Sequence, residues 1–361
     1  MGEPRIPSPP CRGGVGTCTL ASPHRPSYAF RKGSGMLVGT WNLENLMLPH
    51  SGDGAPGTEA EYEAKVEALA SVITALDPAL LGVQEVRQEE TLDDLVKAIG
   101  GEWHTALSRH ADRRGIRVGF LSRTPLRIRR DTHAFADKLR PVQGDDGLEP
   151  DAHDKVTSRG FLAVETDTGD GVLQVAVAHL KSKLLSYPGT GDRSRFQPHD
   201  EAERARFGAY ALYRRAAEAT TLRALAGFLL EGAGTERNVI VLGDMNDVVN
   251  AATTQILLGP PGSELDKKRA FNKSDLGDPF RLWDIAPCIP EERRFSRVSF
   301  GRAELIDHVL VSHRLARRIV EAGTGLPEHR DDALVLPSVD EDPTKRVGTP
   351  GSDHAPVWVR V

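Results

Sequence analysis

Short apolar segments that end in polar side chains recur along this 361-residue chain and restrict the folds open to it. The polar side chains at these ends are, in chain order, Asn42, Glu85, His179, Asp244 with Asn246, Asp307 with His308, and Asp353 with His354. A single acidic residue after a buried strand is usually a turn or helix-capping residue, and a single asparagine there is usually a turn residue. Six such positions in one chain are much harder to explain as turns. We therefore expect them to meet at one functional site.

Strand and helix patterns alternate from residue 37 onward. Short β-rich or alternating runs predict strands at 37–42, 80–83, 116–122, 160–165, 172–180, 238–242, 305–311 and 356–361. Apolar residues at helical spacing predict helices at 59–76, 91–99 and 201–231. The interleaving predicts an α/β protein with a single compact domain over residues 36–361. Long surface loops are expected at 131–158, 182–200 and 259–279.

The first 35 residues differ from the rest, because they are crowded with Pro and Gly and show no apolar periodicity. Such a segment cannot bury enough apolar surface to offset the entropy of ordering it. We expect residues 1–35 to be a disordered extension, or a non-native one if translation starts at Met36. The apolar region of a signal peptide is missing, so a cytoplasmic location is expected.

Composition excludes several classes of protein. No apolar run approaches the roughly 18 residues that a membrane span needs, so no membrane association is expected. Three cysteines exclude a disulfide scaffold and give no zinc-finger spacing. The formal net charge, 46 − 51 = −5, excludes a protein that coats nucleic acid by bulk charge alone. A local basic face stays open, and nothing indicates an obligate protein partner.

The polar set fits the chemistry of one hard cation. Mg²⁺ prefers oxygen ligands and binds through one or two carboxylates together with substrate phosphate oxygens. Glu85 would supply a carboxylate, with Asn42 and Asp353 as further oxygen donors. Softer metals are disfavoured, because neither thiolates nor His-x-x-x-His spacing accompanies the acids. The other groups suit water activation and charge stabilisation at phosphorus; they are His179, Asp244, Asn246, Asp307 and His354.

With these residues in place, the chain resembles the endonuclease/exonuclease/phosphatase superfamily, the deoxyribonuclease I-like metal-dependent phosphodiesterases and phosphatases. The matching segments are Thr40-Trp41-Asn42, Val83-Gln84-Glu85-Val86, Ala178-His179-Leu180-Lys181-Ser182, Leu242-Gly243-Asp244-Met245-Asn246-Asp247, Ile306-Asp307-His308 and Ser352-Asp353-His354-Ala355-Pro356. Their order spans essentially the whole chain after residue 36. The resemblance implies an α/β four-layer sandwich, in which two mixed β-sheets pack face to face between flanking helices. It also implies a site at one edge and Mg²⁺ or Mn²⁺ as cofactor.

The same resemblance implies roles in metal binding and water activation. Glu85 would be the main metal ligand, and Asn42 would support the metal or the phosphate. Asp353 would complete the acidic cluster. Asp244 would orient or deprotonate the attacking water, and Asn246 would hold the phosphate or the nucleophile.

Roles in proton transfer and charge stabilisation are implied as well. His354 would donate to a nonbridging phosphate oxygen, while Asp307 would fix the tautomer of its imidazole and favour the charged form. His179 would face the scissile phosphate and assist the leaving group. Lys181 shares a strand face with His179 and is a further candidate contact for phosphate, as is Arg159. The simpler alternative for both is a solvated cation at a strand end.

The fold alone does not settle the substrate. Nucleic acid is the first candidate substrate, because a basic stretch could neutralise several of its phosphates. Its members are Arg109, Arg113, Arg114, Arg117, Arg123, Arg127, Arg129 and Arg130. The alternative is that these arginines are solvated or paired with acids, which leaves a small phosphorylated metabolite or a lipid head group as substrate. A distant alternative is a non-catalytic phosphate-binding relative, which would predict gaps in the polar set. The arginines of the 201–231 helix are expected mostly on a surface face with charge pairs.

Overall fold

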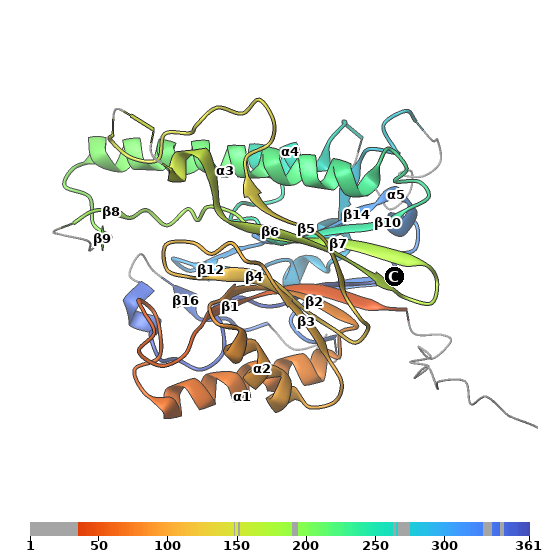
Figure 1. Cartoon of the computed structure of the whole chain (residues 1–361), viewed down its shortest axis with the longest axis horizontal. Helices are drawn as coiled ribbons and strands as arrows, with labels where there is room; N and C mark the ends of the chain where they lie inside the picture. The colour runs from red at the N-terminus through yellow and green to blue at the C-terminus, as the bar shows by residue number, and fades with distance from the viewer. Residues whose placement is uncertain are drawn as a thin grey trace, which may run out of the picture.

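The computed structural model describes residues 35–147, 149–150, 152–189, 194–262, 265, 275–327, 334–339 and 343–361. The predicted extension at residues 1–35 lies outside this part of the chain, apart from its last residue. Two six-stranded β-sheets pack face to face, and helices cover both outer sides (Figure 1). The α/β four-layer sandwich of two mixed sheets is therefore confirmed.

Each sheet is built around one central parallel pair of strands. Sheet A has the order β15-β17-β1-β2-β4-β3 and sheet B the order β11-β14-β10-β7-β6-β5. The strands of sheet A are β1 (Leu37–Leu46), β2 (Leu80–Val86), β3 (His104–Leu107), β4 (Arg117–Ser122), β15 (Glu321–Thr324) and β17 (Val357–Arg360). Those of sheet B are β5 (Arg127–Ala134), β6 (Val156–Asp167), β7 (Val172–His179), β10 (Asn238–Asp244), β11 (Leu282–Asp284) and β14 (Asp307–Ser312). Only β1–β2 and β7–β10 pair in parallel among these neighbours.

Alternating strand residues separate the core between the sheets from the two outer faces. Val38 of sheet A and Ile240 of sheet B belong to the cluster between the sheets. Their neighbours Leu37 and Val241 instead join the clusters that face the helices. Because side chains alternate along a strand, a slip of one residue would exchange these faces. Burial on both faces therefore fixes the register of the central strands.

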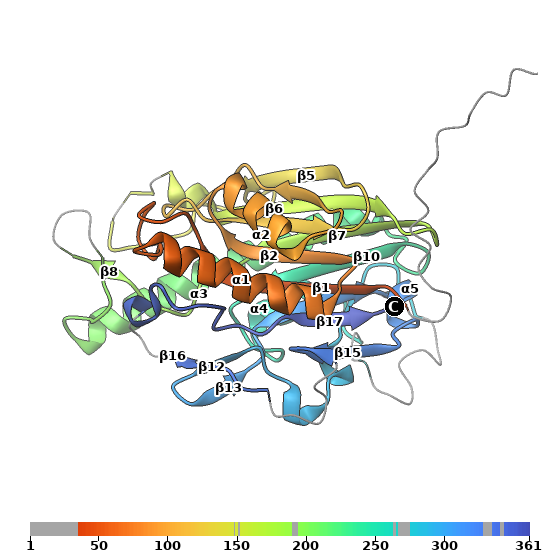
Figure 2. The same ribbon diagram turned by 90° about the horizontal axis from the view of Figure 1, so that it is seen from below.

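Two pairs of helices form the outer layers. Helices α1 (Glu59–Leu76) and α2 (Glu89–Ile99) cover sheet A, and Figure 2 shows α1 lying over this sheet. Helices α3 (Glu201–Leu230) and α4 (Ala252–Leu258) cover sheet B. Thr58 and Glu61 form a capping box at the start of α1, which satisfies backbone N–H groups of the first turn. None of the helices in the described residues is long and apolar enough to cross a membrane.

Short elements connect these layers. They are α5 (His313–Ala316), β8 (Tyr187–Pro188), β9 (Ser194–Arg195), β12 (Arg297–Ser299), β13 (Arg302–Glu304), β16 (Ser338–Val339), and the 3₁₀ helices His153–Lys155, Ala286–Cys288, Glu291–Arg293 and Pro343–Arg346. The loop predicted at 131–158 is shorter than expected, since β5 and β6 occupy its two ends. The loop predicted at 182–200 contains β8 and β9, and part of the 259–279 loop lies outside the described residues.

The carboxyl ends of both parallel pairs lie where the site residues occur. Asn42 and Glu85 are near the ends of β1 and β2, and His179 and Asp244 end β7 and β10. Gly243 lets β10 approach β7 just before Asp244: its φ is 141°, and a Cβ there would lie 1.9 Å from the Ala178 carbonyl oxygen. Only glycine tolerates both the conformation and the close approach. The sheet edge is thus shaped by the sequence directly before Asp244.

Candidate active site

Asp244 forms the centre of a buried polar cluster at this edge. The residue is 1% exposed, and its Oδ2 accepts a hydrogen bond of 3.1 Å from Nδ2 of Asn42 in the other sheet. Nε2 of His179 lies 3.3 Å from the same oxygen, and Nε2 of His354 lies 4.0 Å from it. Groups far apart in sequence therefore surround a single carboxylate.

Glu85 joins this cluster through Asn42. Nδ2 of Asn42 is 3.4 Å from Oε1 of Glu85, while Oε2 of Glu85 accepts a 2.9 Å hydrogen bond from the Asn45 backbone N–H. Glu85 has a φ of 64°, and the β2–β4 register shifts at this residue. Such bulges redirect side chains and recur beside functional sites. The bulge turns an acidic residue of a buried strand toward the sheet edge, where it is 14% exposed.

His354 and Asp307 form a buried pair, with 2.6 Å between Nδ1 and Oδ2. Burial alone would lower the pKa of His354, but the carboxylates of Asp307, Asp353 and Asp244 outweigh it and raise this pKa to about 10. The imidazole is therefore charged at neutral pH. Burial and the charge of Asp307 raise the pKa of Asp244 to about 6. The pair thus places a charged donor beside a carboxylate that is near its titration range.

His179 has the opposite protonation state. Burial, together with the nearby charges of Arg159 and His354, lowers the pKa of His179 well below its usual value. Nδ1 of this imidazole is buried, and no residue in the described part of the chain forms a hydrogen bond with it. Burial and Arg159 also lower the pKa of Lys181 to about 8. Arg159 is 8% exposed, with its Nε 3.4 Å from Oδ2 of Asp112. Both predicted phosphate contacts thus lie near His179.

Asn246 and the segment around it are held from several sides. Asn246 has a φ of 52°, its backbone N–H donates to Asp244, and its Nδ2 donates 3.0 Å to the Leu180 carbonyl. His308 is not directed at Asp244: it bonds Asp284 through Nδ1 and the Asp247 carbonyl through Nε2. His308 therefore supports the Asp244–Asp247 turn.

Glu44 is a site residue that the sequence analysis missed. Its carboxylate accepts the Asp353 backbone N–H at 2.8 Å and binds Arg346 through two contacts of 2.6 and 2.7 Å. Asp353 in turn pairs with Arg297 at 3.2 Å and lies 3.9 Å from Nε2 of His354. The register of β1 shifts between Asn42 and Leu46, and Glu44 has a φ of 50°, so the regular alternation of a strand does not place this side chain and could not have found it.

Two sets of side chains could hold a divalent cation. Ligand atoms of Asp244, Asp307 and His354 lie within 4.8 Å of one another. A protonated His354 has no lone pair to offer, however, so this set is better suited to charge pairing. Among the described residues, Oε1 of Glu85 has only long contacts, 3.4 Å to Asn42 and 3.9 Å to Arg114, and keeps lone pairs for a cation. Its oxygen donors fit a hard cation such as Mg²⁺.

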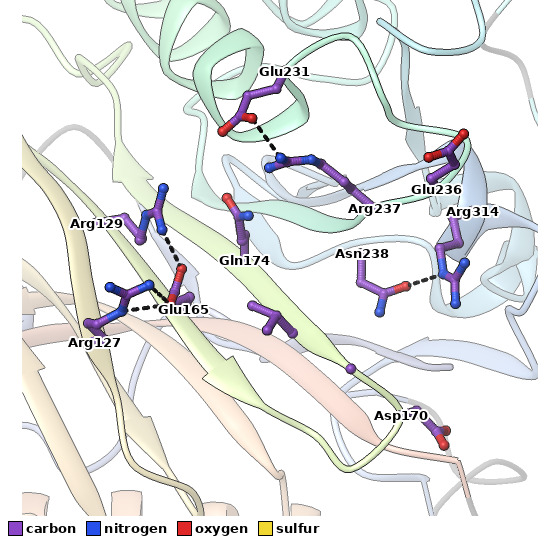
Figure 3. Close-up of a pocket in the computed structure, with 12 residues that line it drawn as sticks. Arg127, Arg129, Glu165, Asp170, Gln174, Glu231, Glu236, Arg237, Asn238 and Arg314 are labelled. Atoms are coloured by element: carbon purple, nitrogen blue, oxygen red, sulfur yellow. Dashed lines mark hydrogen bonds and ion pairs between the residues drawn. The ribbon is translucent and has the colours of Figure 1, made fainter. Parts of the chain in front are cut away.

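Three members of the predicted basic stretch lie at two different ends of the molecule. Arg114 is near the cluster, 3.1 Å from Oδ1 of Asn45. Arg127 pairs in register with Glu165 of β6. Glu165 in turn pairs with Gln174, near the start of β7 and away from the end that carries His179. Figure 3 shows Arg127 and Arg129 directed at Glu165. The three residues line a pocket of about 430 Å³. These two arginines are paired with an acid and lie away from Asp244.

Comparison with known proteins adds the family. A sequence model of the Endonuclease/Exonuclease/phosphatase family matches residues 39–354. Similar solved structures include ANGEL2, a 2',3'-cyclic phosphatase, with 12% identity, a TM-score of 0.51, and 90% of this chain and 95% of that chain covered. The human Nocturnin catalytic domain is 14% identical with a TM-score of 0.48, and the match covers 90% of this chain and 93% of that chain. A mannosyl-6-phosphatase from Bacteroides thetaiotaomicron is 17% identical with a TM-score of 0.48, and the match covers 90% of this chain and 98% of that chain.

A comparison with curated proteins finds no significant match. The family model covers most of the chain, from β1 to His354, and includes every site residue described above. Members of this family are hydrolases of phosphoester bonds and are generally dependent on divalent metals. The chain belongs to the endonuclease/exonuclease/phosphatase family.

Proposed function

We propose that this protein is a divalent-metal-dependent hydrolase that cleaves phosphoester bonds by in-line attack of an activated water. One observation carries the proposal: Asn42, His179 and His354 all lie within 4.0 Å of the same Asp244 carboxylate oxygen. A buried carboxylate among a neutral and a charged imidazole suits proton transfer around phosphorus.

Glu85, with Asn42 and Asp353, would hold Mg²⁺ or Mn²⁺. When bound, the cation would polarise the phosphoryl group and offset its charge. Asp244 orients the attacking water and takes its proton, because its pKa of about 6 leaves it mostly ionised at neutral pH. Asn246 holds the nucleophile or the phosphate.

Charge that develops on the phosphate is stabilised by the two imidazoles. His354 donates from Nε2, while Asp307 holds its Nδ1 and keeps the ring charged. His179, which is neutral, faces the leaving group. Lys181 and Arg159 add cationic charge for a phosphate. The geometry is consistent with preorganised donors around a transferring phosphoryl group.

The first candidate substrate is nucleic acid, cleaved as a phosphodiester. Arg114, beside Glu85, is the member of the basic stretch that supports it. A second candidate is a small phosphorylated metabolite or lipid head group. The pairing of Arg127 and Arg129 with Glu165, away from the site, favours this second candidate, because fewer arginines are then available to a long backbone. The predicted cytoplasmic location stays a prediction.

The reaction type is tested with a generic aryl phosphodiester. The full chain should hydrolyse it with Mg²⁺ or Mn²⁺, lose activity with EDTA, and lose at least ~10³-fold in kcat on Asp244→Ala or His354→Ala. His313→Ala is the matched control, because His313 is a buried histidine near Asp278 at the other end of β14. Metal-independent turnover, or undiminished activity in the two site variants, would contradict the proposal.

The substrate class is tested with a panel under one metal condition. The panel contains plasmid, single-stranded DNA, abasic-site duplex, RNA, sphingomyelin and inositol phosphates. The nuclease proposal expects a nucleic acid to have the highest kcat/KM. Preference for a phosphomonoester over every nucleic acid would favour the second candidate instead.

A further inference from the structure

Helix α3 buries three charged side chains close together. The arginines of this helix are expected mostly at the surface, and Arg204 and Arg206 are exposed, but Arg214 and Arg215 are buried. Arg214, Arg215 and Glu218 are 9%, 6% and 0% exposed. Glu218 stands four residues after Arg214 and three after Arg215, which places it beside both arginines on the helix. Burying charge is costly unless it is hydrogen-bonded. What these side chains bind therefore indicates what they stabilise.

Glu218 binds the backbone of two segments that carry site residues. Oε1 accepts the Ser158 N–H at 2.6 Å, and Oε2 accepts the Lys181 N–H at 2.6 Å. Ser158 directly precedes Arg159 on β6, and Lys181 follows His179 by two residues. One buried carboxylate thus joins the ends of the two strands that deliver Arg159 and His179.

The two arginines extend these contacts to the neighbouring segments. Arg214 donates to the Val156 carbonyl at 3.0 Å, at the start of β6. Arg215 donates to the Lys181 carbonyl at 3.1 Å and pairs with the Asp247 carboxylate, also at 3.1 Å. Asp247 follows Asp244 and Asn246. Helix α3 is therefore bonded to three consecutive site-bearing segments of sheet B.

The backbone of Leu180 connects several of these contacts. Its carbonyl accepts hydrogen bonds from Nδ2 of Asn246 and, at 3.4 Å, from Arg159, while its N–H donates to the Asp244 carbonyl. Leu180 lies between His179 and Lys181, so any shift of the Lys181 backbone would move it. The position of the Lys181 backbone is set in part by Glu218 and Arg215.

We propose that Glu218 is a positioning residue, which with Arg214 and Arg215 forms an α3 clamp that holds His179 and Arg159 in register with Asp244. The proposal rests on the proposed function, because the clamp acts on the reaction through His179. Glu218 touches no reacting atom. Its effect is on where the neutral imidazole and the guanidinium lie relative to the phosphate.

The clamp predicts a rate effect for Glu218→Gln. A glutamine of the same shape has one acceptor oxygen, so its NH₂ would face the N–H of either Ser158 or Lys181, and one donor would lose its bond. A displacement near 1 Å in a catalytic group can cost about 10²-fold in rate. We expect kcat on the aryl phosphodiester to fall about 10- to 100-fold and KM to change less than about threefold.

Glu203→Gln is the matched control. Glu203 lies on the same helix, is 8% exposed, and accepts a backbone N–H from His199 at 2.6 Å, but it contacts no site-bearing segment in the described residues. It should lower the melting temperature similarly and leave kcat within about twofold of wild type. Wild-type kcat in a folded Glu218→Gln variant, or an equal loss in Glu203→Gln, would overturn the proposal.

Hydrogen exchange measured without substrate separates the clamp from the function. Glu218→Gln should speed exchange of the Ser158 and Lys181 amides, and Glu203→Gln should not. Unchanged exchange overturns the clamp, whereas an inactive wild-type protein overturns the proposed function alone. If Glu218→Gln does not fold, Glu218→Asp keeps the charge on a shorter side chain. That variant should also lose kcat, and wild-type turnover in it would overturn the proposal.

Discussion

At the scale of single residues, the His354–Asp307 pair links the chemistry of the site to stability. The raised pKa of His354, about 10 in the folded protein, compares with about 6.5 for an unperturbed histidine. A group whose pKa rises on folding stabilises the folded protein. This stabilisation is complete at pH values below the pKa in the unfolded state, and it is lost as pH rises through the pKa in the folded state. The pair should therefore stabilise the protein at neutral pH and cease to do so near pH 10.

Asp307→Asn should reduce the free energy of unfolding of the metal-free protein by about 3 kcal/mol at neutral pH, because it removes one partner of a buried pair. The difference from wild type should shrink as pH rises through about 10, where wild-type His354 loses its proton. Urea denaturation at several pH values measures both quantities. Asp278→Asn, near His313 and outside the cluster, is the control. A difference that does not change with pH would contradict the assignment of charge to His354.

At the scale of elements, the packing of the two sheets depends on a glycine in β2. A Cβ at Gly82 would lie 2.2 Å from Cδ1 of Leu242 and 3.1 Å from Cγ2 of Val177, both in sheet B. The side-chain period places Gly82 on the face of β2 that meets the other sheet. The residue is therefore small because sheet B approaches closely here, a few residues before Glu85.

Gly82→Val should destabilise the protein by about 1–3 kcal/mol, since the added methyl groups overpack a filled core. Gly208→Ala in α3 is the control, because no atom of the residues that the structure describes lies within 4 Å of the added Cβ. Alanine is a better helix former than glycine, so this change should stabilise by about 0.5–1 kcal/mol. Denaturant midpoints measure both effects, and a neutral Gly82→Val would show that the sheets can separate at this point.

At the scale of the whole molecule, charge is divided between two opposite edges of the sandwich. The carboxyl ends of the parallel strand pairs carry the acidic and imidazole groups with Arg114 nearby. The other edge of sheet B carries the cavity lined by Arg127, Arg129 and Glu165 (Figure 3). A polyanionic substrate seated at Asp244 should therefore respond to charge at the first edge alone.

Arg114→Gln should raise KM for a nucleic acid substrate several-fold and reduce the slope of log KM against log salt, because one phosphate contact is lost. Arg127→Gln removes an equal charge at the other edge and should leave both quantities unchanged. The comparison is made at several salt concentrations with one oligonucleotide. Equal effects of the two substitutions would place the nucleic acid on a surface other than the one at Asp244.

Most main elements could be predicted from the sequence because their signals are local. Helix α1 has the predicted bounds, which the capping box and the Asp77-Pro78 end define. Three longer strands, β3, β5 and β15, were missed, together with helix α4 and the strands of three residues or fewer. Most of these segments are too short to show a recognisable period, and β5 is mostly polar. The polar residues at strand ends were found individually, and the structure brings Asn42, His179 and His354 around Asp244. Their roles stay predictions.

The sequence by itself determined the order of strands and helices, the two faces of each central strand, and the oxygen- and nitrogen-bearing residues at the strand ends. These properties follow from periodicity and turn chemistry within short segments. Only the tertiary structure decided that Glu44 contacts Asp353, that Glu218 is fully buried, and that Arg127 lies away from Asp244. Each of these depends on which distant segments pair and in which register, and no local pattern encodes that choice.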